Sequence, residues 1–173
     1  RRDTVETMLA RLRHRGPESS GLLLDRRAAI GHARLAIIDT LGGGQPLANE
    51  DESLWLSFNG EIFNYRELAE QLRTLGHRFR TASDSEVIVH AWEQWGPGCL
   101  NRFNGQWAFA LWDTRSERLV LARDPVGICP LFYTALADRF LFASQVTALF
   151  ADPGVPRELD PDGLDQVLSY WSA

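Results

Sequence analysis

Apolar residues recur at intervals of three and four in only a few parts of the chain, and these parts are predicted helices. They are residues 4–12, which stop before Gly16-Pro17, residues 64–75, residues 85–95 and the short segment 145–150. Asn64 is the predicted N-cap of the second helix, with Glu67 three residues later. A tail interrupted by prolines, residues 152–162, leads into a further helical start at 163–165.

Most other hydrophobic runs are short and lie between turn residues, as in antiparallel strands. We expect hairpins that pair 21–25 with 28–39, 106–113 with 118–123, and 131–133 with 139–143. Single strands are predicted at 53–58, ending at Asn59-Gly60, and at 77–81. The runs 35–38 and 108–111 hardly alternate, so their strands should be covered on both faces. This order predicts an α+β fold, layered α/β/β/α, with two mainly antiparallel sheets.

Composition narrows the functional classes. The 173 residues suit one domain. All 18 basic residues are arginine, which excludes a Schiff-base lysine and the lysine of a phosphate-binding P-loop. A net charge of -5 argues against nucleic acid as a partner, and no apolar run approaches the ~20 residues that span a membrane. Two cysteines, Cys99 and Cys129, predict free thiols in a reducing cytoplasm.

The sequence predicts no metal site. It has no His-Glu-x-x-His and no Cys-x-x-Cys motif. The four histidines are separated along the chain, and each is expected to be structural or on the surface. Gly42-Gly43-Gly44 lacks the spacing and the following helix of a phosphate-binding loop, so a plain loop is expected there.

Arg34 is the only charged residue in the run Gly31-His-Ala-Arg-Leu-Ala-Ile-Ile38. An arginine in such an apolar strand needs a partner, because an unpaired buried charge is costly. That partner could be an internal acid of the protein. It could also be the carboxylate of a ligand, which the planar guanidinium binds through two hydrogen bonds.

Asn59-Gly60-Glu61 follows a predicted strand and also allows two interpretations. Asn-Gly favours a tight turn, which would give the segment a purely structural role. Alternatively, the Asn59 amide and the Gly60 N–H point at one place and stabilise an oxyanion.

Two further segments carry charge at the ends of predicted elements. Ser83-Asp84-Ser85-Glu86 has the pattern of a capping box, but Asp84 could equally accept hydrogen bonds from a substrate ammonium at an exposed edge. Arg123-Asp124-Pro-Val-Gly127 could be no more than an internal salt bridge at a sheet corner.

Taken in order, these segments resemble the class II glutamine amidotransferase domain of glutamine-hydrolysing asparagine synthetases. The resemblance covers nearly the whole chain. The matching segments are Arg13-His-Arg-Gly-Pro-Glu18, Gly31-His-Ala-Arg-Leu-Ala-Ile-Ile-Asp39, Gln45-Pro-Leu47, Asn59-Gly-Glu-Ile-Phe-Asn64, Ser83-Asp-Ser-Glu86, Phe103-Asn-Gly-Gln-Trp-Ala-Phe-Ala-Leu-Trp-Asp113 and Ala122-Arg-Asp-Pro-Val-Gly-Ile-Cys-Pro-Leu-Phe-Tyr133.

The resemblance implies an Ntn-hydrolase α/β/β/α sandwich and a site for glutamine. Arg34 would hold the substrate α-carboxylate, Asn59 and Gly60 would form the oxyanion hole, and Glu61 and Asp84 would receive the α-ammonium. The Ile37–Ile38 backbone would line the pocket. In this family the nucleophile is an N-terminal cysteine whose α-amine can serve as the base, and the ammonia that is released travels to a synthetase domain.

One departure from the family is large, because the chain starts at Arg1, within the first helix of the family, and the nucleophilic cysteine is absent. We expect 1–160 to be an N-terminally incomplete amidotransferase domain and 161–173 to lead to an absent synthetase domain. No cofactor is expected in 1–160, and Mg-ATP belongs to the absent domain; a homodimer is an option. The alternatives are a catalytically silent domain, as in relatives of β-lactam synthetase, and a module that only binds an amino acid.

Overall fold

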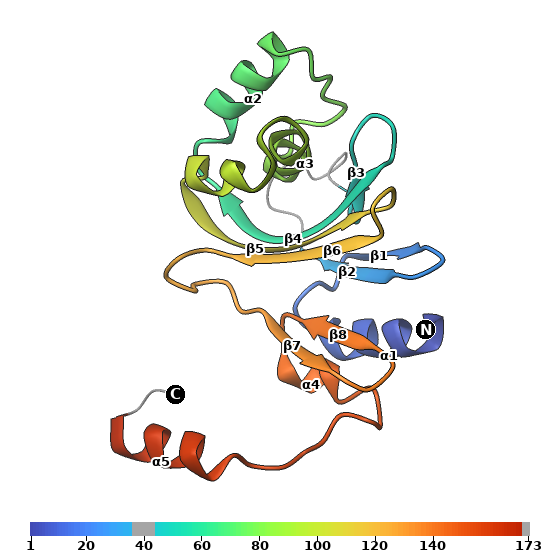
Figure 1. The fold of residues 1–173 in the computed structure, drawn as a ribbon, viewed down its shortest axis with the longest axis vertical. Helices are drawn as coiled ribbons and strands as arrows, with labels where there is room; N and C mark the ends of the chain where they lie inside the picture. The colour runs from blue at the N-terminus through green and yellow to red at the C-terminus, as the bar shows by residue number, and fades with distance from the viewer. Residues whose placement is uncertain (36–43, 171–173) are drawn as a thin grey trace.

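A computed structural model describes residues 1–35 and 44–170 (Figure 1). The helices are α1 (Arg2–Leu12), α2 (Tyr65–Thr74), α3 (Asp84–Trp95), the 3-10 helix η1 (Gly96–Arg102), α4 (Val146–Leu149) and α5 (Pro161–Tyr170). The strands are β1 (Ser19–Leu24), β2 (Ala29–Arg34), β3 (Leu47–Ala48), β4 (Leu54–Ile62), β5 (Gly105–Asp113), β6 (Arg118–Arg123), β7 (Phe132–Ala135) and β8 (Phe140–Ala143). The predicted helices and all three predicted hairpins are therefore confirmed in the described residues.

The elements stack in four layers (Figure 1). Helices α2 and α3 cover one face of the antiparallel sheet β3-β4-β5-β6. The hairpins β1–β2 and β7–β8 lie against its other face, with α1 and α4 outside them. This is the predicted α/β/β/α order. In the described residues the second β layer consists of two separate hairpins and not of one continuous sheet.

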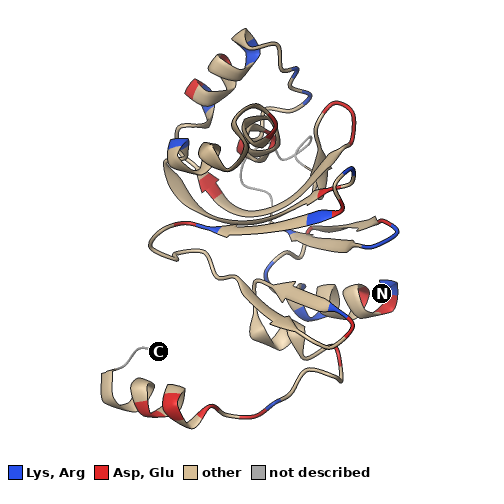
Figure 2. Cartoon of the chain, viewed as in Figure 1, with Lys and Arg blue, Asp and Glu red and all other residues tan. Residues whose placement is uncertain are grey.

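The main core lies between the sheet and the helices. On β4 the residues Leu54, Leu56, Phe58 and Ile62 are buried toward this core, together with the apolar face of α2 and most of α3. Strand β5 is buried on both faces from Trp107 to Trp112, as its non-alternating sequence predicts. Charged side chains accordingly gather at strand ends and on the outer helices (Figure 2).

Polar contacts join the second β layer to the other face of the sheet. His32 on β2 lies 3.0 Å from the Ser57 hydroxyl on β4, measured from its Nδ1. The indole N–H of Trp112 on β5 donates to Asp25 at the end of the β1–β2 hairpin, at 2.7 Å. These contacts fix β2, and with it Arg34, over the face of β4 that looks away from the main core.

Asn59-Gly60 is not a turn, so the turn interpretation is wrong. Strand β4 continues through the pair to Ile62, and Gly60 is in register with Trp107 of β5. Nine-residue pairing with β5 outweighs the local preference of Asn-Gly for a turn. Gly60 has a φ of 134°, and a Cβ there would lie 2.1 Å from the Gln106 carbonyl oxygen. The sequence therefore uses glycine where β4 and β5 come too close for a side chain.

The strand predicted at 77–81 is also absent. Its backbone donors are bound by side chains and not by a neighbouring strand: Glu50 accepts the Arg78 N–H at 2.8 Å, and Glu86 accepts the N–H groups of Arg80 and Thr81 at 2.8 and 2.7 Å. Asn64 is the N-cap residue of α2 by position, but its side chain bonds the backbone of residues 102 and 104. Side chains from distant segments replace the local partners that the sequence suggests.

Replacing Gly60 by alanine should destabilise the fold by about 2 kcal/mol or more, because the new methyl group meets backbone atoms and the φ of 134° strains a side chain. Gly98→Ala is the matched control: nothing lies within 4 Å of a Cβ at that position, so its effect should stay within about 1 kcal/mol. Denaturant midpoints measure both changes. Equal midpoints for the two variants would contradict the close approach of β4 and β5.

Candidate functional site

A cavity of about 580 Å³ lies between the two β layers, lined by β2, β4, β5 and β8, by α1 and by the start of α3. All five described residues to which the resemblance assigns a role line this one cavity: Arg34, Asn59, Gly60, Glu61 and Asp84. Ile37 and Ile38, predicted to contribute backbone, lie outside the described residues. Three chain segments that are distant in the sequence therefore meet around one space of the size of a small-molecule site.

The edge of β4 supplies backbone donors beside the cavity. The short strand β3 pairs only with Trp55 and Leu56 of β4, so the later residues of this edge bind side chains. The Phe58 N–H donates to the Gln45 side chain at 2.6 Å, and the Ile62 N–H donates to Asp84 Oδ2 at 3.0 Å. Backbone N–H groups of alternate residues point to the same side of a strand, so the Gly60 N–H belongs to this edge, between the two. Asn59 and Glu61 share the face of β4 that looks away from the main core.

Two acidic side chains, those of Glu61 and Asp84, line the cavity near the end of β4. Asp84, the first residue of α3, is only 5% exposed, so the prediction that it lies at an exposed edge is wrong. Burial raises the pKa of the Asp84 carboxyl, hydrogen bonds from the Ile62 and Ser85 N–H groups oppose this, and the nearby charge of Glu61 raises the pKa further. A cation placed between the two carboxylates would relieve this repulsion.

Positive charge comes from Arg34 on β2. His32, two residues earlier on the same face of the strand, also lines the cavity. Burial, with a smaller contribution from the charge of Arg34, lowers the pKa of His32 to about 4. The imidazole is therefore neutral near pH 7, and Arg34 carries the positive charge of this wall of the cavity. Arg15, in the segment after α1, also lines the cavity. The cavity thus combines two arginines, two carboxyl groups and amide donors, and this set includes groups complementary to a zwitterionic amino acid with a polar side chain.

Sequence reasoning gave no role to several polar residues of the cavity wall, among them His32, Ser57 and Gln45. The period of two along a strand places His32 beside Arg34 and Ser57 beside Asn59, so this signal could have found the first two. Gln45 reaches Phe58 from a distant loop, and nothing in the local sequence predicts that contact.

The predicted capping box of α3 is present in part. Ser83 is the N-cap, and its hydroxyl accepts the Ser85 N–H at 3.3 Å. Glu86 does not return to the N-cap but binds residues 80 and 81. This arrangement holds the first turn of α3, and Asp84 with it, at the cavity.

The turn after β6 is organised by Asp124 and not by an ion pair with Arg123. Although burial opposes its ionisation, backbone N–H groups hold the pKa of Asp124 at about 2. These donors belong to Trp107, Val126, Ile128 and Cys129. Arg123 donates to the carbonyl groups of Gly127 and Cys129. The segment is a structural corner, as the sequence suggested, but hydrogen bonds to the backbone form it in place of the suggested salt bridge.

Neither cysteine is suited to be a nucleophile. Both are free, as predicted, and both are buried. Burial raises the pKa of the Cys99 thiol to about 12. Burial and the charge of Asp124 raise the pKa of the Cys129 thiol. Because the thiolate is the reactive form, these two thiols are inert near neutral pH.

The histidines are less scattered than their sequence positions indicate. His77 and His90 lie together with Glu50 and Glu93, and the ligand atoms of these four residues are all within 4.8 Å of one another. None of the four is among the residues described as lining the cavity.

Comparison with known proteins agrees with the geometry of the cavity. A family model described as a glutamine amidotransferase domain matches residues 1–173. The chain belongs to this family. Asparagine synthetases (glutamine-hydrolysing) 1 and 3 of Bacillus subtilis (strain 168) are 39% and 36% identical to it over 168 residues, covering 97% and 96% of this amidotransferase domain. The asparagine synthetase of Asparagus officinalis is 46% identical over 132 residues, or 76% of the chain.

These relatives are much longer than the amidotransferase domain described here. The matched part is 26%, 27% and 22% of their respective lengths, so the chain spans about a quarter of each synthetase. Among solved structures, the glutamine phosphoribosylpyrophosphate amidotransferase of B. subtilis superimposes with a TM-score of 0.69 at 25% identity. That match covers 86% of this chain and 40% of the other, and it confirms the predicted Ntn-hydrolase fold.

Proposed function

We propose that this amidotransferase domain binds free L-glutamine and hydrolyses its side-chain amide, as the glutaminase half of an asparagine synthetase. The observation that carries the proposal is the set of groups that line one cavity: Arg34, the acidic pair Glu61 and Asp84, and Asn59 and Gly60 of β4. In a free amino acid the α-carboxylate and the α-ammonium are both attached to the α-carbon. The guanidinium suits its carboxylate, and the acidic pair suits its ammonium.

With both charges held, the side chain of glutamine extends toward Asn59 and Gly60. A cysteine thiolate attacks the carboxamide carbon, and the oxygen that becomes negative accepts hydrogen bonds from the Asn59 amide and the Gly60 N–H. The α-amine of this N-terminal cysteine takes the thiol proton when the thiolate forms. When the tetrahedral intermediate collapses, the C–N bond breaks, and the cysteine α-ammonium gives this proton to the departing ammonia. Water then releases glutamate from the thioester. We assign the nucleophile to a cysteine that precedes Arg1, because Cys99 and Cys129 are buried and protonated.

The partner in this proposal is a C-terminal synthetase domain of the same protein, where Mg-ATP activates aspartate for reaction with the ammonia. The length of the relatives supports it. Helix α5 lies at the end of an extended segment, away from the four layers (Figure 1). It exposes Leu164, Val167, Leu168 and Tyr170, an apolar face that a second domain would cover.

Among the described residues no helix has the length and apolarity to cross a membrane. We place the protein in the reducing cytoplasm, where its thiols would stay free.

Release of ammonia and glutamate from L-glutamine by the full-length protein tests this function. We expect equal amounts of both products, and no release from D-glutamine, whose α-substituents cannot meet Arg34 and the acidic pair together. If the protein carries the preceding cysteine and binds glutamine without releasing ammonia, the domain is a binding module. If glutamine does not bind, the domain is catalytically silent, and the proposal fails.

A further inference from the structure

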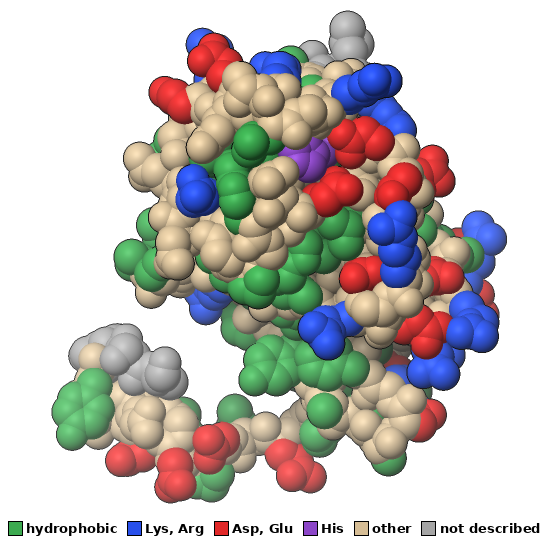
Figure 3. Space-filling view, turned by 45° about the horizontal axis from the view of Figure 1, so that its top comes forward, with side chains coloured by type: hydrophobic (Ala, Val, Ile, Leu, Met, Phe, Trp, Pro, Cys, Tyr) green, Lys and Arg blue, Asp and Glu red, His purple; other side chains and the backbone are tan. Residues whose placement is uncertain are grey.

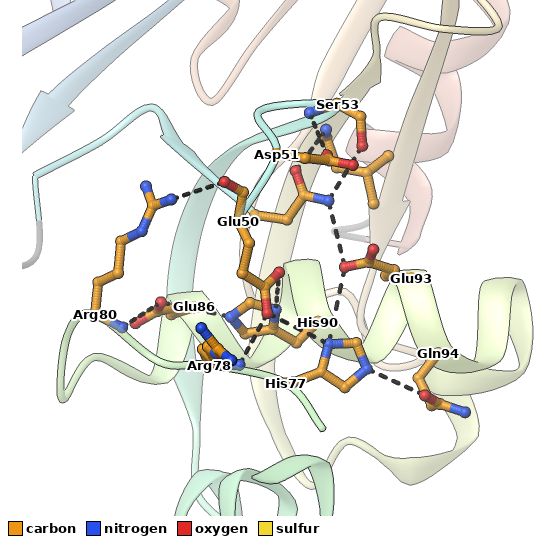
Figure 4. Close-up of polar contacts among 12 residues, drawn as sticks. Glu50, Asp51, Ser53, His77, Arg78, Arg80, Glu86, His90, Glu93 and Gln94 are labelled. Atoms are coloured by element: carbon orange, nitrogen blue, oxygen red, sulfur yellow. Dashed lines mark hydrogen bonds and ion pairs between the residues drawn. The ribbon is translucent and has the colours of Figure 1, made fainter. Parts of the chain in front are cut away.

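Four potential metal ligands converge on the outer side of the main core, away from the catalytic residues proposed above. Glu50 comes from the turn between β3 and β4, His77 from the loop after α2, and His90 and Glu93 from α3 (Figure 4). We call these four residues the α3 cluster. It is the only group of this kind within residues 1–35 and 44–170.

His90 presents an unused nitrogen to the centre of the cluster. The residue is 1% exposed, and its Nε2 lies 3.4 Å from Glu86 Oε1. The Glu86 carboxylate acts only as a hydrogen-bond acceptor: it accepts hydrogen bonds from the N–H groups of Arg80 and Thr81 and from the Thr81 hydroxyl. The ring proton therefore belongs on Nε2, and Nδ1 carries a lone pair. This Nδ1 has no hydrogen-bond partner, although Glu50 Oε2 is 3.3 Å away, because the two are not aligned for a hydrogen bond.

His77 has the same arrangement. Its Nε2 lies 3.1 Å from the Gln94 side-chain oxygen, which leaves Nδ1 as the nitrogen with a lone pair. That Nδ1 is 3.8 Å from Glu50 Oε1 and 3.8 Å from Glu93 Oε2 (Figure 4). Both histidines thus turn Nδ1 inward and bind an acceptor outward, as metal-ligating histidines do when a second residue fixes their tautomer.

The carboxylates are oriented too. The Arg78 N–H donates to Glu50 Oε1 at 2.8 Å, and the Asn49 side-chain amide donates to Glu93 Oε2 at 3.3 Å. The side chains of Glu50 and Glu93 are 33% and 38% exposed, whereas those of His77 and His90 are 10% and 1% exposed. In the space-filling view, histidine atoms reach the surface between acidic side chains in the half of the molecule that holds α2 and α3 (Figure 3). An ion could therefore enter past the carboxylates.

We propose that the α3 cluster binds one divalent transition-metal ion, with Zn²⁺ as the best match. Imidazole and carboxylate are ligands that Zn²⁺ accepts, at about 2.0–2.2 Å. In a tetrahedral site of that size, ligand atoms lie about 3.3–3.6 Å apart. The Nδ1–Oε2 distance of 3.3 Å between His90 and Glu50 already matches. The 3.8 Å contacts of His77, and other ligand atoms that are within 4.8 Å of one another, have to move closer when the ion binds.

The bound ion is structural and not catalytic, because four protein ligands fill a tetrahedral site and leave no position for water. It joins the β3–β4 turn and the loop after α2 to the middle of α3. The first residue of that helix is Asp84, which lines the cavity. Metal binding should therefore stabilise the element that presents Asp84, and it involves none of the residues proposed for glutamine hydrolysis.

Zinc binding to the full-length protein, purified without a histidine tag and stripped with a chelator, tests this site. The parent should bind one Zn²⁺ more per chain than the double variant Glu50→Gln/Glu93→Gln, measured by competition with a chromophoric chelator. Glu93→Gln alone should weaken binding by about tenfold or more. At 100 times the dissociation constant, Zn²⁺ should raise the midpoint of thermal unfolding by about 5–10 °C in the parent and not in the double variant.

Glu70→Gln, a change of the same kind on the exposed face of α2, is the control and should leave binding unchanged. Tetrahedral coordination is checked with Co²⁺, whose visible absorption should be intense in the parent and weak in the double variant. Circular dichroism verifies that the variants fold. Equal zinc content and equal thermal shifts in parent and double variant would overturn the site. In that case the contacts among the four side chains would serve the fold alone.

Discussion

Replacing Asn59 by alanine should lower kcat for glutamine hydrolysis by about 10²–10³-fold, while KM changes by less than about threefold. In the proposed mechanism the amide of Asn59 donates to an oxygen that is negative only after the nucleophile attacks, so its loss raises the barrier more than it weakens substrate binding. Steady-state ammonia release by the full-length protein, measured over a range of glutamine concentrations, separates the two constants.

Asn101→Ala is the matched control for this change, because Asn101 is exposed on η1 and is not among the residues that line the cavity. It should leave both constants unchanged. A rise in KM with an unaltered kcat in Asn59→Ala would show that the amide binds the ground state, and the assigned role would be wrong.

Replacing Arg34 by alanine should raise KM for glutamine by about 10²-fold or more and affect kcat less. In the proposed mechanism the guanidinium binds the α-carboxylate in the ground state and the transition state alike, and loss of one partner of a desolvated charge pair costs about 2–5 kcal/mol. Arg34→Lys keeps the charge but not the two parallel hydrogen bonds, so it should fall between the parent and the alanine variant.

Arg27→Ala serves as control on the same hairpin. Arg27 pairs with Glu117 at the exposed end of that hairpin and is not among the residues described as lining the cavity. Its removal should leave KM unchanged. An Arg34→Ala variant with the KM of the parent would mean that the arginine has a structural partner only, the other interpretation that its sequence context allows.

The local sequence pattern was sufficient to predict elements whose contacts are made between residues close together in the sequence. The hairpins β1–β2, β5–β6 and β7–β8 each join strands close in sequence, and the amphipathic helix α2 buries Leu68, Ala69 and Leu72 as its spacing predicts. Prediction failed where distant segments decide. Asn59-Gly60 is extended because β5 pairs with it, and residues 77–81 are irregular because Glu50 and Glu86 bind their N–H groups.

In the candidate site, too, local sequence pattern predicted some features, and others depended on contacts between distant segments. The residue types around Arg34 and Asn59 suggested charge recognition and oxyanion stabilisation, but each pattern alone also fitted a structural role. Only the family resemblance assigned the individual roles. The grouping of His77 with His90 escaped prediction altogether, because a loop and a helix that share no ligand-spacing motif bring the two rings within 5.1 Å. A buried nitrogen without a hydrogen-bond partner is visible only in three dimensions.

The central claim is that one cavity recognises the free amino acid through Arg34 at one end and the acidic pair Glu61 and Asp84 at the other. A crystal structure of the full-length protein with L-glutamate, the product of the reaction, tests it most directly. We predict the α-carboxylate on the guanidinium, the α-ammonium between the two acidic side chains, and the side-chain carboxylate beside Asn59 and Gly60. Glutamate bound elsewhere, or in this cavity with its α-carboxylate away from Arg34, would contradict the account.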